Sequence, residues 1–332
     1  MSDSGSDVVK WADPAMFRAA PMERDSRGFV TPRVHLLSAT PDPLGVNATG
    51  FRMYGGVPTY DLAQIPDDGK WGRRWAWEES LNTHLAAPWE FIDMQFFIEG
   101  VTRAFTHQMV RQRTAVYAQE SLRFAVKEGF ANETALPPSL HGADENLVKI
   151  WTDMIDQIEE TYENLVNAGV PAEDARGLLP HCVTTRLHYK TNYRNLVEHA
   201  GNRLCTQAQF EWRTVFLGIM KAIKNYRATY RCARPGGGEL VSHSDWQFEE
   251  LARPMAKTFT PVCYKAGKCV FMGELDRLCT IRDRVQAFAG AGVSSSEWHK
   301  GHVPNPEGVN YMDQVIEGIN PAEWMADPTA AR

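Results

Sequence analysis

The chain has 332 residues, of which 43% are hydrophobic and 23% charged, as in an ordinary folded protein with a sizeable core. Its formal net charge of -6 excludes the global basic field that nucleic-acid binders use. No apolar run approaches the roughly 18 to 20 residues of a membrane span, and the first residues lack the features of a signal peptide. We therefore expect a cytoplasmic protein with no membrane or nucleic-acid partner, whose six cysteines are reduced.

Hydrophobic periodicity predicts alternating strands and helices after a polar, irregular lead-in that covers residues 1 to 32. Strands are expected at residues 34 to 39, 91 to 98, within 114 to 124, and 181 to 189. Helices are expected at residues 45 to 54, 73 to 85, 101 to 111, 144 to 167, 192 to 204, about 206 to 230, and 245 to 257. A Thr-x-x-Gln capping box at residues 206 to 209 opens the sixth helix.

The clearest helix is the one at residues 144 to 167, because apolar side chains recur along it at helical spacing. They are Leu147, Ile150, Trp151, Met154, Ile155, Ile158, Tyr162, Leu165 and Val166. We interpret this helix as scaffold that carries no chemistry.

A cluster of cationic and amide side chains lies between residues 103 and 124. Arg103, His107 and Arg111 share one face of the expected helix, and a separate stripe of Val101, Phe105 and Met109 is apolar. No matching run of carboxylates lies nearby in the sequence, and guanidinium groups suit phosphate bidentately. The cluster favours an anionic ligand, and a solvated basic helix face is the alternative.

A second polar cluster follows at residues 176 to 213. Asn192, His199 and Arg203 share one helical face with the apolar Leu196, which favours a ligand role for Arg203. Arg194 and Glu198 have the spacing of an i,i+4 ion pair. For Glu211 and Arg213, a surface or interhelix ion pair and a ligand role stay equally open.

Together the two clusters resemble the flavin-dependent thymidylate synthases. The family signature is Arg-His-Arg, seven residues, then Ser and usually another Arg. This sequence fits the signature with one change, Gln112 for the central histidine. The matching residues are Arg111-Gln112-Arg113, the seven residues 114 to 120, and Ser121-Leu122-Arg123. A second family signature is also resembled, with its parts in the same order. These parts are Leu179-Pro180, Asn192-x-Arg194, Arg203 and residues 208 to 211. The resemblance covers about residues 32 to 230.

The resemblance implies an α/β fold in the broad sense (α+β), with a mixed β-sheet flanked by long helices. It implies a catalytic domain at residues 33 to 230 and leaves residues 231 to 332 as a C-terminal extension of unknown role. It also implies a homotetramer with active sites where subunits meet. The expected reaction is reductive methylation of deoxyuridylate (dUMP) to thymidylate (dTMP), with FAD, NADPH and 5,10-methylenetetrahydrofolate.

Site residues are carried over from the resemblance position by position. Those expected to bind the nucleotide are Gln108, Arg111, Gln119, Glu120, Ser121, Leu122, Arg123, Arg176 and Arg203. Those expected at the flavin and folate are His84, Arg111, Gln112, Arg113, Gln119, Asn192, Arg194 and Glu198. Arg203, Arg111 and Ser121 are the expected catalytic residues, with Ser121 as a hydrogen-bonding ligand because no base partner is evident. No metal is expected.

Three positions depart from the family pattern. Gln112 replaces the central histidine, so an imidazolium is lost while hydrogen bonding survives. Glu198 replaces what is often a neutral polar residue, and Gln207 replaces the usual histidine before Ala-Gln. These changes leave two alternatives open. The first is a relative that transfers a hydroxymethyl group or uses another pyrimidine nucleotide. The second is a non-catalytic relative that binds nucleotides. A DNA-binding protein ranks third because the net charge is acidic.

The cysteines have their own interpretation. Pro180-His181-Cys182 contains the same residue types as the Pro-Cys-His segment of cysteine-dependent thymidylate synthases, but in a different order. A nucleophilic Cys182 is therefore disfavoured. The residues Cys263, Cys269, Cys279, His299 and His302 lack the spacing of a common zinc ribbon, and buried thiols are favoured there.

Overall fold

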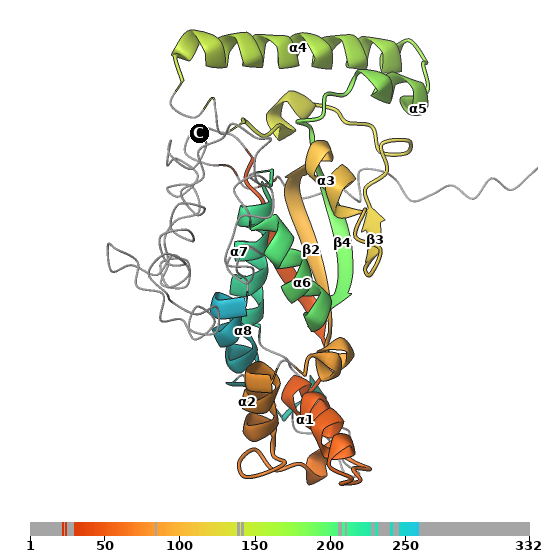
Figure 1. Ribbon diagram of the computed structural model, residues 1–332. Helices are drawn as coiled ribbons and strands as arrows, with labels where there is room; N and C mark the ends of the chain where they lie inside the picture. The colour runs from red at the N-terminus through yellow and green to blue at the C-terminus, as the bar shows by residue number, and fades with distance from the viewer. Residues whose placement is uncertain are drawn as a thin grey trace, which may run out of the picture.

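The computed structural model describes residues 22, 24, 30–83, 85–137, 140, 143–204, 208–209, 211–226, 230–231, 240–241 and 246–258. Its main sheet has the strand order β1-β2-β4-β3, and all three pairings are antiparallel (Figure 1). The strands are β1 (Arg33–Ala39), β2 (Asp93–Thr102), β3 (Val116–Gln119) and β4 (Thr184–Asn192). A separate two-stranded pair consists of β5 (Tyr230–Arg231) and β6 (Leu240–Val241).

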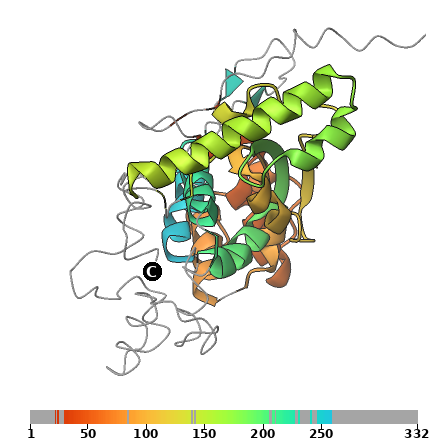
Figure 2. The same ribbon diagram turned by 90° about the horizontal axis from the view of Figure 1, so that it is seen from above.

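Helices surround this sheet at both ends and on one face (Figures 1 and 2). They are α1 (Pro43–Tyr54), α2 (Arg73–Thr83), α3 (Arg103–Met109), α4 (Glu145–Asn167), α5 (Ala172–Ala175), α6 (Tyr193–Arg203), α7 (Glu211–Lys224) and α8 (Trp246–Thr258). Four short 3-10 helices are η2 (Leu62–Gln64), η3 (Ala87–Phe91), η4 (Phe130–Glu133) and η6 (Arg176–Leu178). The helices α1 and α2 lie at one end of the sheet, and α4 crosses the other end.

The buried face of the sheet follows from alternation along the central strands. In β2, the side chains of Met94, Phe96 and Ile98 are fully buried, and Leu187 and Tyr189 of β4 lie beside them on that face. These residues share one hydrophobic cluster with apolar residues of α6 and α7. The helix α7 approaches β1 closely at Gly218, where an added Cβ would lie 2.7 Å from Cγ2 of Val34.

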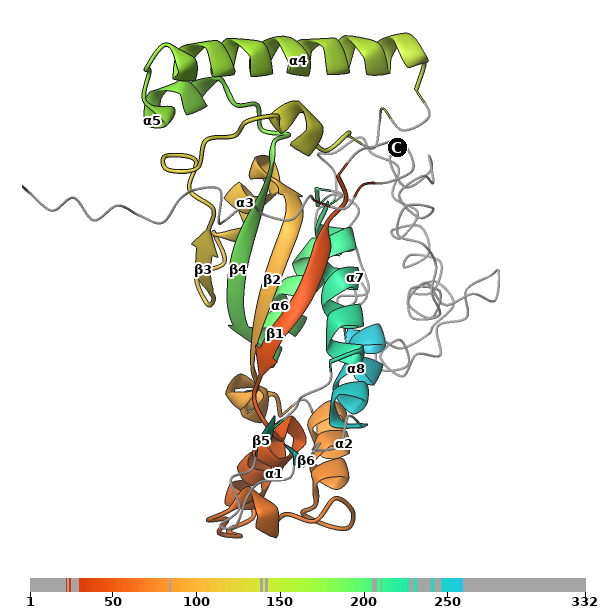
Figure 3. The same ribbon diagram turned by 180° about the vertical axis from the view of Figure 1, so that it is seen from behind.

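The opposite face of the sheet carries no helix among the described residues, as the view from behind shows (Figure 3). It bears an ionic network in which Glu99 of β2 lies 3.5 Å from Arg186 of β4 and 4.0 Å from Arg33 of β1. The register shifts beside Gly100, whose φ of +71° and close approach to Thr31 O exclude a side chain.

The predicted class and element order are confirmed, with changes at several bounds. The sheet is antiparallel throughout where a mixed sheet was expected, because β1, β2, β4 and β3 alternate in direction. The helix α3 is shorter than predicted, because β2 continues to Thr102 and a turn follows Met109. The helix α7 begins at Glu211, after the expected capping box, whose Thr206 lies outside the described residues.

The apolar stripe of α4 is buried only along its C-terminal half. Ile155 and Tyr162 pack against Phe130 and Val183, as expected of a scaffold helix. Three stripe residues in the first half are more than half exposed, namely Leu147, Ile150 and Met154. The described part of the chain therefore covers only part of the stripe.

Part of the expected C-terminal extension contributes to the core. Phe248 and Leu251 of α8 belong to the main hydrophobic cluster, and the side-chain oxygen of Gln247 accepts a hydrogen bond from the backbone of Leu44 at 3.0 Å. The rest of residues 231 to 332 lies almost entirely outside the described residues, as does most of the lead-in. The domain boundary at residue 230 stays a prediction.

Candidate functional site

The first polar cluster is tied to the second at the beginning of α3. Thr102 caps this helix, since its hydroxyl accepts from the backbone N–H of Phe105 at 3.1 Å. The carboxylate of Glu211, the first residue of α7, accepts from the Thr102 backbone N–H at 2.7 Å and from its hydroxyl at 2.6 Å. Gln209 donates to the same carboxylate. Glu211 thus joins the beginnings of α3 and α7, a role that neither of the two open alternatives described.

A second link runs through the side-chain amide of Gln108 near the end of α3. Its oxygen accepts from Trp212 Nε1 at 3.0 Å, and its nitrogen donates to the Gln209 side-chain oxygen at 2.6 Å. These residues are 101 and 104 positions apart in the sequence. Since both hydrogen-bonding ends of the amide are used, Gln108 fixes α3 against α7, and its expected contact with a nucleotide stays a prediction.

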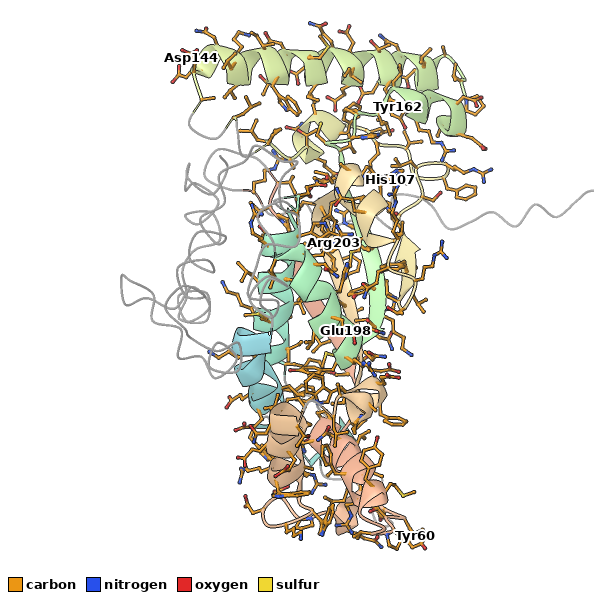
Figure 4. All side chains as sticks on the ribbon, in the orientation of Figure 1. Tyr60, His107, Asp144, Tyr162, Glu198 and Arg203 are labelled. Carbon is orange, nitrogen blue, oxygen red and sulfur yellow. The ribbon has the colours of Figure 1, made fainter. Side chains whose placement is uncertain are left out.

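Arg203 lies at the end of α6, beside this network (Figure 4). Its Nε donates to His199 Nε2 at 3.3 Å, and its guanidinium lies over the Trp212 ring, 4.7 Å from the centroid. Among the described residues no carboxylate pairs with it. The two Nη groups of this half-buried cation are therefore left as donors for a ligand.

Burial sets the charge of the groups around Arg203. Burial, together with the nearby Arg203 cation, lowers the pKa of His199 to about 4. The imidazole is therefore neutral at pH 7, as it must be to accept a hydrogen bond through Nε2. Burial also lowers the pKa of Arg203, which stays cationic because an arginine pKa begins so high.

The carboxyl group of Glu211 makes stability depend on pH. Burial raises its pKa from 4.5 to about 7, and the hydrogen bonds from Thr102 and Gln209 offset this only in part. The folded state therefore holds a proton between pH 4.5 and 7 that the unfolded state releases. The free energy of unfolding should then fall by about 3 kcal/mol as pH rises through this window.

Urea unfolding measures this pH dependence of the free energy of unfolding when the wild type and Glu211→Gln are compared across pH 4 to 8 at one protein concentration. The amide imitates the protonated acid, so the difference between the two proteins should shift by about 3 kcal/mol in favour of the variant as pH rises. A difference that does not change with pH would refute the raised pKa.

The Arg-Gln-Arg segment lies between α3 and β3. Arg111 and Arg113 are exposed, and within the described part of the chain neither side chain has an ion pair or hydrogen bond. Gln112 is held in place, because its side-chain oxygen accepts from the hydroxyls of Tyr189 at 3.2 Å and Tyr117 at 3.5 Å. The amide nitrogen of Gln112 is the end left for other contacts.

The loop after β3 is closed by a buried lysine. Lys127 Nζ lies 3.1 Å from the carboxylates of both Glu120 and Glu133, and its own side chain is only 5% exposed. Glu120 also accepts from the Thr185 hydroxyl at 3.2 Å. Between Glu120 and Lys127 the loop carries Ser121, whose hydroxyl accepts from a backbone N–H at 3.3 Å.

The polar residues in and beside that loop already make some hydrogen bonds and ion pairs within the chain. Gln119 donates to the Thr106 hydroxyl at 2.8 Å, and Leu122 is buried. Arg123 is half exposed and pairs with Glu173 at 2.9 Å. The backbone carbonyl of Glu173 also accepts from Arg176 Nε at 3.0 Å. The loop and Arg176 therefore lie close together, as a shared nucleotide site requires.

Arg103 and His107, on α3, are further cationic or titratable groups beside this loop. The Arg103 guanidinium lies 3.5 Å from the Glu120 carbonyl oxygen, and burial together with nearby Arg176 lowers its pKa. His107 stacks on His181, with 5.9 Å between ring centroids. The expected face of Arg103 and His107 exists, but Arg111 lies beyond the end of the helix.

The beginning of α6 carries the residues expected at the flavin. Asn192 caps the helix, accepting from the Asn195 N–H at 2.9 Å. The predicted pair of Arg194 with Glu198 is confirmed at 2.9 Å, and Arg194 also lies 2.6 Å from Glu90.

Glu198 lies midway along α6 and Arg203 is its last residue (Figure 4), whereas Arg194 lies in the first turn, nine residues from Arg203 in the sequence. That spacing corresponds to about 13 Å along the helix axis. Arg194, expected at the flavin, and Arg203, expected at the nucleotide ring, are thus held apart by most of the length of α6. His84 lies outside the described residues.

The thiol of Cys182 is poorly suited to nucleophilic attack. It is partly buried, and burial raises its pKa to about 11, so it is a neutral thiol at pH 7. The other cysteines, together with His299 and His302, lie outside the described residues.

Sequence reasoning assigned no role to several residues that the structure places at the site. His199 was placed on the face of Arg203 without a function, and Tyr117, Lys127 and Tyr189 were not singled out. Lys127 contacts Glu133 and Glu120 at sequence separations of 6 and 7, and such contacts within a loop produce no periodic pattern in the sequence. The i,i+4 spacing of His199 and Arg203 was the one usable clue.

Comparison with known proteins places this arrangement in a family. The sequence profile described as "Thymidylate synthase complementing protein" matches residues 65–226. Flavin-dependent thymidylate synthase of Geobacter sulfurreducens is 35% identical over 148 residues, which are 44% of this chain and 63% of that protein. The enzyme of that name from Thermococcus onnurineus is 34% identical over 168 residues, covering 46% of this chain and 69% of that protein.

A third relative, the flavin-dependent thymidylate synthase of Pyrococcus furiosus, is 39% identical over 127 residues, covering 38% of this chain and 52% of that protein. The chain belongs to the flavin-dependent thymidylate synthase family. It matches between about half and two thirds of the length of these curated relatives.

A solved structure, the UMP/dUMP methylase PolB from Streptomyces cacaoi with bound 5-Br dUMP, aligns with a TM-score of 0.47 and 19% identity. The alignment covers 58% of this chain and 90% of that one. Among the described residues no helix is both long and apolar enough to cross a membrane.

Proposed function

We propose that this protein methylates deoxyuridylate to thymidylate, with FAD, 5,10-methylenetetrahydrofolate as carbon donor and NADPH as reductant. The observation that carries the proposal is the held guanidinium of Arg203, whose Nη groups have no carboxylate partner among the described residues. Family membership supports the same reaction.

The chemistry of the pyrimidine explains the need for such a group. Carbon 5 of uracil is a weak nucleophile, and it becomes a stronger one when N3 gives up its proton to water, because the resulting negative charge is shared by N3, the ring oxygens and carbon 5. A guanidinium already fixed in place stabilises that charge without reorganising during the reaction. Arg203 supplies this group at the pyrimidine edge, and Arg111 is an exposed second cation.

The nucleotide phosphate suits the loop that Lys127 closes. Ser121, Arg123 and Arg176 offer a hydroxyl and two guanidinium groups close together, and guanidinium groups bind phosphate oxygens in pairs. The paired carboxylate of Glu173 is exposed, so exchanging it for a phosphate costs little. Gln119, Glu120 and Leu122 shape the loop around this position.

The remaining polar residues fit a second, larger anionic ligand. Arg113 has no partner within the described chain, and Asn192 and Arg194 lie along the start of α6. These donors suit the diphosphate and ring edges of FAD. When bound, flavin supplies hydride transfer, and the chain supplies orientation and charge. Gln112, fixed through its oxygen, offers an N–H donor where the family has an imidazole.

The proposal includes assembly into a homotetramer with active sites between subunits. The three exposed apolar residues of α4, namely Leu147, Ile150 and Met154, support an interface there, since a contiguous apolar patch is costly in water. The exposed Arg111 and Arg113 suit ligands that a neighbouring subunit helps to cover. Sedimentation of the full chain tests the assembly.

The first test is whether purified protein carries flavin and turns over deoxyuridylate. The holoenzyme should absorb near 450 nm and release tritium from carbon 5 of deoxyuridylate when methylenetetrahydrofolate and NADPH are both supplied. Omitting either co-substrate should stop the release. A protein that cannot be loaded with flavin would refute the proposal.

Flavin content should separate the roles of three arginines. Arg113→Ala and Arg194→Ala should lose most of the bound FAD, because each removes a cation proposed at the cofactor. Arg203→Ala should keep it, because Arg203 lies about 13 Å along α6 from Arg194. The ratio of absorbance at 450 nm to that at 280 nm gives the occupancy. Equal retention in all three variants would contradict the assigned roles.

Hydroxymethyl transfer is the alternative that the altered signature favours. Gln112 stands where the family has a titratable histidine, and its side-chain oxygen is held by two tyrosines rather than free to exchange protons. If the methylene group on carbon 5 receives no hydride from the flavin, water adds to it instead, and the one-carbon unit stays on the ring as a hydroxymethyl group. The mass of the product nucleotide distinguishes the two outcomes.

A further inference from the structure

A guanidinium is useful for electrostatic stabilisation only when its plane and rotation are both fixed before the substrate binds. An arginine side chain loses most of its rotamer freedom when it is held in one conformation, which costs free energy. Groups that hold it in the free protein therefore remove that cost from the binding step.

Arg203 is held from two directions by its own chain. His199 accepts from Nε in the plane of the guanidinium, at 3.3 Å, one helical turn earlier on α6. The Trp212 ring of α7 lies against the guanidinium, with its centroid 4.7 Å from the central carbon. One contact fixes the rotation and the other fixes the plane, so both Nη groups stay available.

The two supporting groups are themselves rigid. Trp212 is fully buried, its Nε1 donates to Gln108, and Phe105 packs against its ring at 4.4 Å between centroids. His199 meets Trp212 and Phe216 edge to face, with centroid distances of 4.9 and 5.7 Å.

With Nε2 as an acceptor, the imidazole of His199 carries its proton on Nδ1, which is buried and has no partner among the described residues. Leaving that donor unpaired costs free energy. The histidine is thus poorly explained as a packing residue alone.

We propose that His199, together with Trp212, is a positioning residue that holds Arg203 by accepting a hydrogen bond from its Nε, so that both Nη groups face the pyrimidine edge of the nucleotide. This rests on the proposed function, in which Arg203 binds deoxyuridylate. It adds a residue that the family signatures in this sequence do not contain.

The test is a double-mutant cycle on the FAD-loaded full chain, with the dissociation constant for deoxyuridylate measured by titration calorimetry. His199→Phe keeps an aromatic ring but removes the acceptor, and should weaken binding about ten-fold. His199→Gln restores an acceptor oxygen and should bind within about three-fold of the wild type. In an Arg203→Ala background, His199→Phe should have no further effect, because there is no Nε left to hold.

Phe216→Leu is the matched control. It disturbs the packing around the same imidazole but leaves Nε2 and Arg203 in contact, so it should lower thermal stability without changing the dissociation constant. Should His199→Phe not fold, the smaller apolar His199→Leu takes its place in the cycle.

The outcomes separate the two proposals. If the wild type does not bind deoxyuridylate, the proposed function and this inference both fail. If Arg203→Ala weakens binding but His199→Phe does not, the inference alone is overturned. The same holds if His199→Phe weakens binding equally with and without Arg203, because the effect is then structural.

Discussion

Arg203→Ala should lower kcat for thymidylate formation by about 10² to 10³-fold, the usual loss when one fixed donor is removed from developing negative charge. The loss should be larger in kcat than in the affinity for deoxyuridylate, because the pyrimidine binds as a neutral ring and is ionised only on the way to the transition state. The variant should fold, since Arg203 pairs with no buried carboxylate in the described structure.

Arg203→Lys is the control for this prediction. Lysine keeps the positive charge but loses the planar fork, the Nε donor to His199 and the stacking on Trp212. We expect it to recover less than a tenth of the lost rate. Single-turnover oxidation of reduced flavin in the presence of both substrates measures the chemical step. If Arg203→Lys is as fast as the wild type, charge alone suffices and the orientation argued here is unnecessary.

Lys127→Met should lower the free energy of unfolding by roughly 1 to 3 kcal/mol, because the carboxylates it leaves are partly exposed and Arg186 stays 3.9 Å from Glu120. It leaves the carboxylates of Glu120 and Glu133 without their shared cation, while the lysine that pairs them is almost fully buried. The loop that carries Ser121 and Arg123 should loosen with it. Affinity for deoxyuridylate should therefore fall in the same variant, even at temperatures where the protein stays folded.

Lys149→Met provides a matched comparison on the surface. Lys149 pairs with Asp153 at 2.7 Å on α4, but both side chains are about half exposed or more. Such a pair contributes about 0.5 kcal/mol or less. Urea unfolding of both variants, with the nucleotide titrated into each, gives the comparison. If the two lysine variants lose similar stability and Lys127→Met binds nucleotide normally, the loop closure has no functional role.

The order of elements was predictable because the strands and helices alternate with clear periods. The stripe of Phe105 and Met109 is buried as expected, and the Arg194 pair follows from i,i+4 spacing. The pairing direction of the sheet was not predictable, because it depends on how α3 and the long segment after β3 bring β4 back beside β2. Periodicity within a strand carries no information about that.

The candidate site was predictable only as a set of residue types in order. Which of them are held by the chain itself depends on contacts more than 100 residues apart, such as Trp212 with Gln108 and Glu211 with Thr102. Glu211 shows the limit most clearly. The sequence left an ion pair and a ligand role open for it, whereas in the fold it is a buried group that joins the beginnings of α3 and α7.

The exposed half of the α4 stripe has a similar explanation. Helical spacing identifies an apolar face but not what covers it. Leu147, Ile150 and Met154 fit the predicted face and are exposed in the single chain. A prediction based on one chain therefore assigns to the core what is proposed here as contact between subunits.

The most direct measurement of the central claim is the mass of the nucleotide made from deoxyuridylate by the flavin-loaded full chain, with methylenetetrahydrofolate and NADPH. Methylenetetrahydrofolate with two deuteriums on its methylene carbon marks the transferred unit. We predict a product in which a methyl group that retains both deuteriums replaces the hydrogen at carbon 5. A hydroxymethylated product would contradict reductive methylation, and unchanged deoxyuridylate would contradict the proposed function as a whole.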